Sequence, residues 1–262
     1  MNKTFTSAAL VLGLFLCPAH AGEDKIPLDE VPVIVDDFEA DFRIDGWIVQ
    51  IDVGLESLAT GLSSSVFIGF DDIISNLDWI VPLGADLRYK RVGFLPDLVA
   101  LKMSGGGTSP GPFFDKASYD LKLGILGLPA YLRLIDQPKT KFDLIGGARY
   151  LWIDFDIGLE GGSVGDAFGA ASAGTEAKIW DGIVGMRVQH EFTDKLFCSV
   201  YGDVGTGDSD LTYQILADVG YRFNDRFSLS AGYRYLHYDL GDADSNVELT
   251  GSGPQVTLNW KF

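Results

Sequence analysis

The sequence predicts an all-β protein, a transmembrane antiparallel up-and-down β-barrel. Three patterns support this prediction: a final strand that alternates strictly, connections that alternate between long and tight, and two bands of aromatic residues around an aliphatic band. We expect about ten strands, with eight or twelve as alternatives, and a short helix in the first long loop. Glycine occurs 32 times in 262 residues and aromatic residues make up 12%, which favours strands and turns over helices.

The last residues of the chain show the strand pattern most clearly. From residue 254 onward, one face is apolar and the other polar, with Pro254, Val256, Leu258, Trp260 and Phe262 opposite Gln255, Thr257, Asn259 and Lys261. A period of two residues is typical of a strand with two different faces. A final strand that ends in phenylalanine resembles the closing strand of outer-membrane barrels, whose assembly machinery binds that terminus. We therefore expect Trp260 and Phe262 to form the assembly signal.

The rest of the chain divides into strands that each exceed the ~9–11 residues needed to cross a membrane with tilt. The predicted strands are 44–54, 79–90, 92–103, 118–132, 140–155, 178–192, 196–205, 211–223, 227–239 and 247–262. Long links at 55–78, 104–117 and 156–177 alternate with tight turns at 90–91, 136–139, 193–195 and 224–226, while 206–210 and 240–246 are of medium length. Long loops at one end and tight turns at the other are typical of outer-membrane barrels, with both termini on the tight-turn side. Pro96 predicts a bulge.

The apolar faces carry aromatic residues at both ends. Near the tight turns we place Tyr89, Phe94, Tyr131, Phe142, Phe192, Tyr221, Phe223, Phe227, Trp260 and Phe262, and near the long loops Trp79, Tyr150, Trp152, Trp180, Tyr213, Tyr233 and Tyr235. Small and aliphatic residues such as Val184 and Ala217 lie between them. Two aromatic girdles around an aliphatic band indicate a lipid-facing surface, so the polar faces should line the lumen.

A lumen enclosed by so few strands is narrow enough for side chains to fill it. We predict a charge network there, made of Asp86, Arg88, Asp97, Lys122, Asp143, Arg149, Asp181, Arg187, Asp218, Arg222 and Arg234. Opposite charges should pair in this confined space, because an unpaired buried charge costs several kcal/mol. The lumen is therefore expected to be plugged.

The amino-terminal residues predict export. Residues 1–21 combine Lys3, an apolar run and the small-x-small site Ala19-His20-Ala21, which predicts cleavage after Ala21. Cys17 offers lipidation as an alternative, which Leu16 disfavours. Residues 22–42 are expected to be an irregular periplasmic lead-in, and residues 43–262 the barrel. The net charge of −17 excludes nucleic acid as a favoured partner.

The first long loop contains residues 66–78, with apolar side chains at helical spacing. This helix would pack on the rim or inside the lumen, or alternatively form a gate for a hydrophobic ligand. The segments FDDIISNLD, FLPDLVALKMS, GYRYLHYDL and VELTGSGPQVTLNWKF resemble a large, poorly characterised group of small Gram-negative outer-membrane barrels, similar in architecture to the OmpW and OmpA-like barrels. The resemblance implies a porin-like fold in the cell outer membrane and no established activity. The partners expected there are outer-membrane lipid, lipopolysaccharide, periplasmic chaperones and the barrel-assembly machinery.

Catalytic and metal-binding patterns are weak. His190 is expected on the outward face near a tight turn and His237 near the outer rim, too far from Ser228 and Ser230 to meet them. The run 242–246 lacks the glycine and distal glutamate of a calcium loop. We predict no cofactor, no metal and no enzymatic activity. The favoured function is a plugged, charge-lined barrel with a structural or surface role. A narrow channel or conduit for small or hydrophobic solutes is the first alternative, and a lipid-modifying enzyme is the second.

Overall fold

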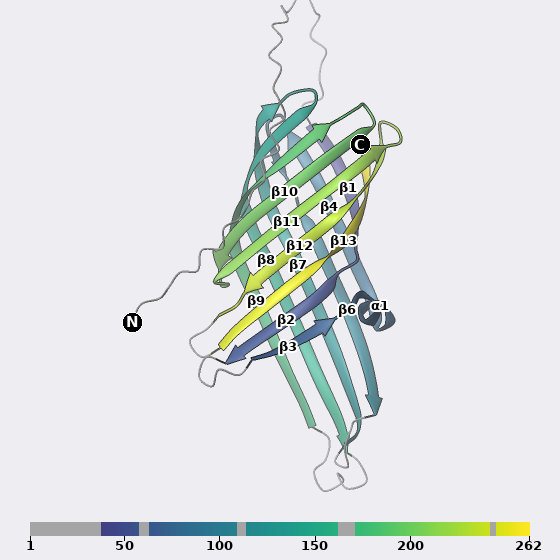
Figure 1. Cartoon of the computed structure of the whole chain (residues 1–262), viewed down its shortest axis with the longest axis vertical. Coiled ribbons are helices and arrows are strands. Elements are labelled where there is room, and N and C mark those ends of the chain that lie inside the picture. Colours follow the sequence, from purple (N-terminus) through teal and green to yellow (C-terminus); the bar gives the residue numbers. More distant parts are fainter. Residues whose placement is uncertain (1–37, 58–62, 109–113, 162–170, 242–244) are drawn as a thin grey trace, which may run out of the picture. The chain divides into compact units, whose positions relative to one another are not determined.

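The protein is a closed antiparallel β-barrel (Figure 1). The computed structural model describes residues 38–57, 63–108, 114–161, 171–241 and 245–262. Its elements are β1 (Phe38–Trp47), β2 (Gln50–Ser57), β3 (Ser63–Ile68), α1 (Phe70–Ser75), β4 (Leu77–Tyr89), β5 (Val92–Phe94), β6 (Asp97–Thr108), β7 (Phe114–Asp136), β8 (Thr140–Gly161), β9 (Ala171–Glu191), β10 (Leu196–Gly207), β11 (Leu211–Arg222), β12 (Phe227–Asp239) and β13 (Ser245–Lys261).

The wall contains ten strands, as predicted. β1 and β2 both pair with β13 and together form the first wall strand, while β5 and β6 both pair with β7 and form the third. β3 is additional and pairs with β2 alone among the described residues. The barrel closes where β1 pairs with β13, from Asp41 opposite Lys261 to Trp47 opposite Gln255.

The tight turns and both described ends of the barrel lie at one end of the wall. Phe38 pairs with Tyr89 beside the turn at 90–91, and Lys261 pairs with Asp41 at the same level. This arrangement confirms the predicted alternation of connections. β1 begins at Phe38, inside the segment 22–42 that we expected to be irregular. The predicted signal sequence and the rest of that segment lie outside the described residues.

The predicted bulge at Pro96 was wrong: Phe94 pairs with Leu87 and Asp97 with Gly84 in one continuous register, so no residue is inserted. β5 ends at Phe94 and β6 begins at Asp97, so the third wall strand is interrupted for two residues. Leu95 N–H still donates to Pro129 O at 2.8 Å, and Ala85 N–H donates to Pro96 O at 2.9 Å. Both neighbours therefore remain bonded to the strand through the interruption, in an unchanged register.

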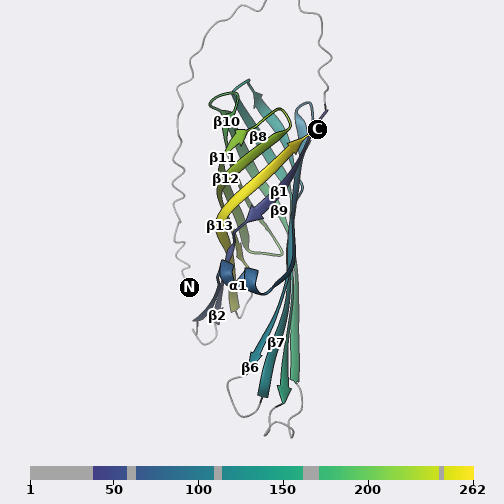
Figure 2. The ribbon, with the colours of Figure 1, turned by 90° about the vertical axis from the view of Figure 1, so that its right-hand side faces the viewer.

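The hairpins of β7, β8 and β9 are longer than predicted. These strands contain 23, 22 and 21 residues, against 12, 12 and 13 in β10, β11 and β12. They extend past the other strands at the long-loop end (Figure 2). The predicted boundaries marked where a membrane crossing should end, but backbone pairing continues beyond that level.

The predicted helix is shorter than the segment 66–78. α1 covers Phe70–Ser75 only, because Ser63–Ile68 pair with Ile51–Glu56 as a strand. Ile73 is 2% exposed, whereas its neighbour Ile74 is 53% exposed. Within the described part of the chain, no helix is long and apolar enough to cross a membrane.

The outer face carries the aliphatic band and both girdles, as predicted. Val184 is 63% exposed, and on β11 the exposed Ala217 alternates with the inward Asp218. At the long-loop girdle, Tyr150 stacks on Trp180 with ring centroids 4.5 Å apart. One girdle assignment was wrong: Tyr131 lies inside the barrel and is 3% exposed.

Candidate functional site: the barrel lumen

The lumen contains three levels that differ in chemistry. At the tight-turn end lies a charged mouth with a cavity of about 500 Å³, the middle level holds about 150 Å³, and an apolar level toward the long loops holds about 30 Å³. Free space thus decreases from the tight-turn mouth toward the long loops.

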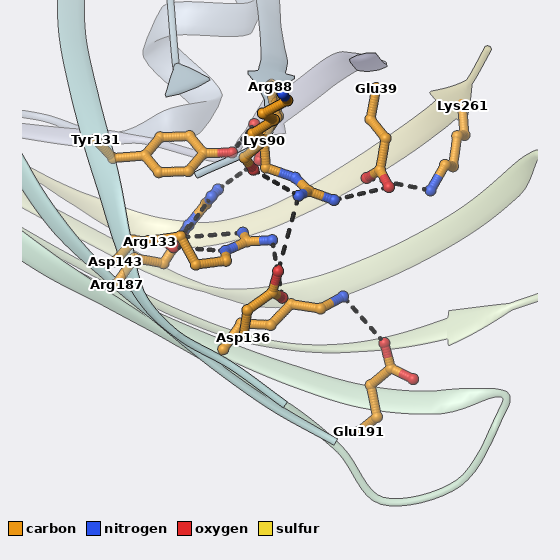
Figure 3. A network of polar contacts seen from close by, with 12 residues as sticks. Glu39, Arg88, Lys90, Tyr131, Arg133, Asp136, Asp143, Arg187, Glu191 and Lys261 are labelled. Atoms are coloured by element: carbon orange, nitrogen blue, oxygen red, sulfur yellow. Dashed lines mark hydrogen bonds and ion pairs between the residues drawn. The ribbon is translucent and has the colours of Figure 1, made fainter. Parts of the chain in front are cut away.

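The strongest polar contacts form a group of two arginines and two aspartates just inside the mouth (Figure 3). Arg187 donates to Asp143 at 2.8 and 2.9 Å and to Asp86 at 2.8 Å. Arg133 donates to Asp143 at 2.8 Å, and Tyr131 O–H donates to Asp86 at 2.8 Å. Asp143 is fully buried. We refer to Asp86, Tyr131, Arg133, Asp143 and Arg187 as the lower cluster, which balances two positive and two negative charges.

Looser ion pairs surround the mouth itself. Arg88 lies 2.7 Å from Glu39, and Lys261 lies 3.5 Å from the other oxygen of Glu39. Arg222 lies 3.3 Å from Glu191. These side chains are 17–46% exposed, so water screens their charges more than in the lower cluster.

The middle level is polar and held by hydrogen bonds between strands. Arg149 donates to Asp203 at 2.5 Å and to Thr212 at 3.2 Å. Arg234 donates to Asp97 at 2.6 Å and to Gln214 at 2.8 Å. Gln214 lies on β11, next to β12, but the other three contacts join strands that are not consecutive in the chain, so this level braces separate parts of the wall.

The level nearest the long loops is apolar, which the predicted charge-lined lumen did not include. Inward side chains from β1, β2, β6, β7, β8, β9, β12 and β13, together with α1, form one packed cluster: Trp47, Val49, Ile51, Ile73, Val99, Leu101, Met103, Leu123, Ile125, Leu151, Ile179, Leu236, Tyr238 and Leu249. We refer to this cluster as the apolar layer.

The structure places most of the predicted network inside the barrel. Asp86, Asp143 and Arg187 meet in the lower cluster, Asp97 meets Arg234, and Arg149 pairs with a residue that we did not predict. Arg88 and Arg222 line the mouth. Two members contact no cation within the described residues: Asp181 accepts from Ser209 N–H at 3.0 Å, and Asp218 lines the middle cavity.

The assignment of Lys122 was wrong. Lys122 follows the outward parity of β7 and lies 2.8 Å from Asp154 on the outer face of β8. On β7 the odd-numbered residues point inward, as the buried Leu123, Ile125 and Tyr131 demonstrate. Lys122 is therefore outside the lumen network.

Arg133 and Asp203 are lumen residues that we did not predict. Arg133 is 3% exposed in the lower cluster, and Asp203 is 7% exposed beside Arg149. Arg133 lies two residues from Tyr131 and shares its face, so placing Tyr131 in the outer girdle also hid Arg133. Asp203 follows Tyr201 on the inward face of β10, in the predicted strand 196–205, to which we had assigned no inward residues.

Both histidines lie on outer faces, beside threonines. His190 Nδ1 is 2.9 Å from Thr140 Oγ1, and His237 Nδ1 is 2.8 Å from Thr250 Oγ1. In the described residues, no carboxylate lies within ion-pair distance of either ring, and no group of histidine, cysteine or carboxylate side chains could hold a metal ion.

Comparison with solved structures places the fold among bacterial outer-membrane proteins. The outer membrane protease OmpT from Escherichia coli has a TM-score of 0.50 and 11% identity, covering 87% of this chain and 97% of that chain. The fold is that of an outer-membrane β-barrel. The translocator domain of the autotransporter NalP from Neisseria meningitidis has a TM-score of 0.40 and 12% identity, covering 88% and 90%. The attachment invasion locus protein Ail of Yersinia pestis has a TM-score of 0.33 and 12% identity, covering 86% of this chain and 99% of that chain.

No protein-family model and no curated protein matches the sequence. The likeness to OmpT therefore concerns the fold of the chain alone.

Proposed function

We propose that this protein is an integral outer-membrane barrel with a closed lumen, which serves a structural or surface role and performs no catalysis. The observation that carries the proposal is the decrease in free space along the axis, from about 500 to 150 to 30 Å³. The charged lower cluster stiffens the wall, and the apolar layer closes the path above it. Export by a signal sequence cleaved after Ala21 and recognition of Trp260 and Phe262 during assembly belong to the same proposal.

The apolar layer is the stronger barrier to ions. A water-filled pore needs polar groups along its whole length, and a constriction lined by apolar side chains excludes water and blocks ions by dewetting. Leu101 and Leu123 lie side by side there, as a cross-strand pair of β6 and β7, and their side chains are 2% and 8% exposed. The polar levels below can hold water, but they end at this layer.

Single-channel recording on refolded protein in planar bilayers tests the proposal. The double variant Leu101→Ala/Leu123→Ala should open transient conducting states, because it removes bulk from the layer. The matched variant Leu83→Ala, which removes the same side chain from a 50% exposed position on the outer face, should behave like the unaltered protein. Steady conduction in the Leu83→Ala variant as well would locate the ion path elsewhere.

A conduit for hydrophobic solutes is the second candidate, favoured specifically by the apolar lining of the upper lumen. An enzyme receives less support from the site. Both histidines contact threonine hydroxyls on the outer face, but within the described residues no carboxylate orients either ring as a catalytic base. Assays for lipase or protease activity on the refolded protein should give no turnover above that of a heat-unfolded sample.

A further inference from the structure

The barrel wall has an open seam between β4 and the β1–β2 strand. β1 pairs with β4 from Phe38 opposite Tyr89 to Ile44 opposite Leu83, and pairing stops there. Beyond this level β4 pairs with β6 on its other side, from Gly84 to Leu77. Within the described residues, neither β3 nor β1 pairs with residues 77–82 of β4. The seam therefore lies between residues 45–49 and residues 78–82.

Pro82 explains why the pairing stops. Ala85 N–H donates to Pro96 O, so odd-numbered residues in this part of β4 direct their backbone groups toward β6, and Pro82 faces β1. The next ladder bond would need an N–H at this position, which proline lacks. On the other side of the seam, residues 45–49 stay bonded to β13 instead, and Ile48 N–H donates to Pro254 O at 2.8 Å.

The seam lies at lipid depth. Trp79 belongs to the long-loop aromatic girdle and is 46% exposed, and Leu83 lies four residues closer to the middle of the band. At 3.3–3.4 Å per residue, with strand tilt, this spans about 10 Å of the hydrocarbon half nearest the long loops. Closed barrels normally leave no strand edge there, because unpaired backbone groups in hydrocarbon are costly.

Between Asp45, which is buried in the lumen, and Asp78 at the long-loop end, the two edges of the seam and the space behind them are apolar. Ile44 and Ile48 are 53% and 38% exposed on the outer face, and Ile80, which pairs with the inward Leu101, is 41% exposed. Trp47 and Val49, which point inward from the same segment as Ile44 and Ile48, line the cavity of about 30 Å³ in the apolar layer. Residues 69–76, which contain α1, connect β3 to β4 and so pass from one side of the seam to the other. Figure 2 shows α1 beside the wall. Ile73 from this helix is buried in the apolar layer.

We propose that this seam binds an acyl chain of a membrane lipid, and that Ile73 acts as the stopper between the chain and the apolar layer. Hydrocarbon is the chemistry that surrounds the wall at this depth, and it matches the apolar edges of the seam. A pairing strand from another protein or a second copy is disfavoured, because Pro82 offers no N–H to it. The cavity of about 30 Å³ behind the seam is too small for a chain, and Ile73 packs in the same apolar cluster, so binding deepens when α1 moves outward. The proposal does not depend on whether the lumen conducts ions.

Fluorescence quenching by phosphatidylcholine vesicles with brominated acyl chains tests this site. The signal of Trp47 is obtained by subtracting the spectrum of a Trp47→Phe variant measured in the same vesicles. We expect partial quenching of Trp47 in the otherwise unaltered protein and at least a threefold increase in quenching with Ile73→Ala. The matched variant Ile74→Ala, on the exposed side of α1, should leave the signal unchanged.

A further variant controls for loosening of the fold. Val99→Leu adds one methylene to the lining of the cavity, and it should reverse the increase when it is combined with Ile73→Ala. Heat-modifiable migration on gels checks that each variant is folded. Trp47 that stays unquenched in both the parent and Ile73→Ala, or equal quenching in Ile73→Ala and Ile74→Ala, overturns the proposal. A cross-linked dimer through residues 78–82 also overturns it, by assigning the seam to a second copy.

Discussion

Replacing Asp143 by alanine tests the energetic role of the lower cluster. Asp143 accepts hydrogen bonds from two arginines, Arg133 and Arg187, and is fully buried. The substitution leaves these two guanidinium groups, 3% and 6% exposed, with Asp86 as the remaining carboxylate of the cluster. Outside the cluster, Asp136 lies 3.8 Å from Arg133 and remains as its weaker partner.

The expected loss follows from this geometry. Removing one partner of a buried ion pair costs about 3–5 kcal/mol, because the other charge stays buried without compensation. Asp143 serves two partners, so we expect about 5 kcal/mol. Adding Arg133→Met removes one of the stranded charges, and the double variant should be about 2 kcal/mol more stable than the sum of the single effects.

Denaturant unfolding of the refolded protein in lipid vesicles measures these differences through tryptophan fluorescence. The matched control is Asp154→Ala on the same strand, whose partner Lys122 lies on the outer face with 47% of its side chain exposed. An exposed pair contributes about 0–1 kcal/mol, so Asp154→Ala should be close to the parent protein. Equal losses for the two aspartates would refute the distinction between lumen and outer face.

Three further predictions concern the wall and its assembly. Val184→Arg and Ala217→Arg should each cost about 2–4 kcal/mol in vesicle unfolding, because the lipid midplane cannot solvate the charge, while the lumen-facing Asp218→Asn should cost less; equal costs would contradict the assigned faces. Lys122→Met should change the free energy of unfolding by no more than about 1 kcal/mol and leave the conductance unchanged, because its side chain lies outside the lumen; a large change in conductance would return Lys122 to the network. Deleting Phe262, which is 67% exposed at the barrel rim, should reduce the outer-membrane fraction and increase periplasmic degradation in cell fractionation; normal outer-membrane levels would contradict its role in assembly.

The barrel could be predicted because its signals are local and repeated. On β11 and β12, apolar and polar residues alternate except at Leu216 and at the long-loop end of β12, and the tight turns fall between such runs. Strand order in an up-and-down barrel then follows the chain, so each hairpin predicts the next pairing. The same alternation located Arg187, Asp143 and Arg234 on the inner face.

The errors on β7 have one physical cause. This strand is apolar on both faces: Leu123 and Ile125 point inward, while Leu126 and Leu128 point outward. Its alternation therefore carries no information on facing, and a one-residue error in parity reverses every side chain. Placing Tyr131 in the outer girdle also placed Lys122 in the lumen.

The apolar layer and the seam required the three-dimensional structure. The rule that lumen faces are polar fails near the long loops, where Leu101 and Val99 point inward and pack as in a soluble core. The seam depends on where β1 leaves β4, which is a matter of register between distant segments. The sequence did contain one signal, Pro82 in the middle of a predicted strand, because proline is confined to strand positions that need no N–H.

Single-channel recording on the unaltered, refolded protein tests the closed lumen most directly. The apolar layer and the paired charges below it predict little or no steady conductance in planar bilayers, with rare, brief openings at most. Large, stable and ion-selective currents from the unaltered protein would contradict the closed lumen and favour the channel instead.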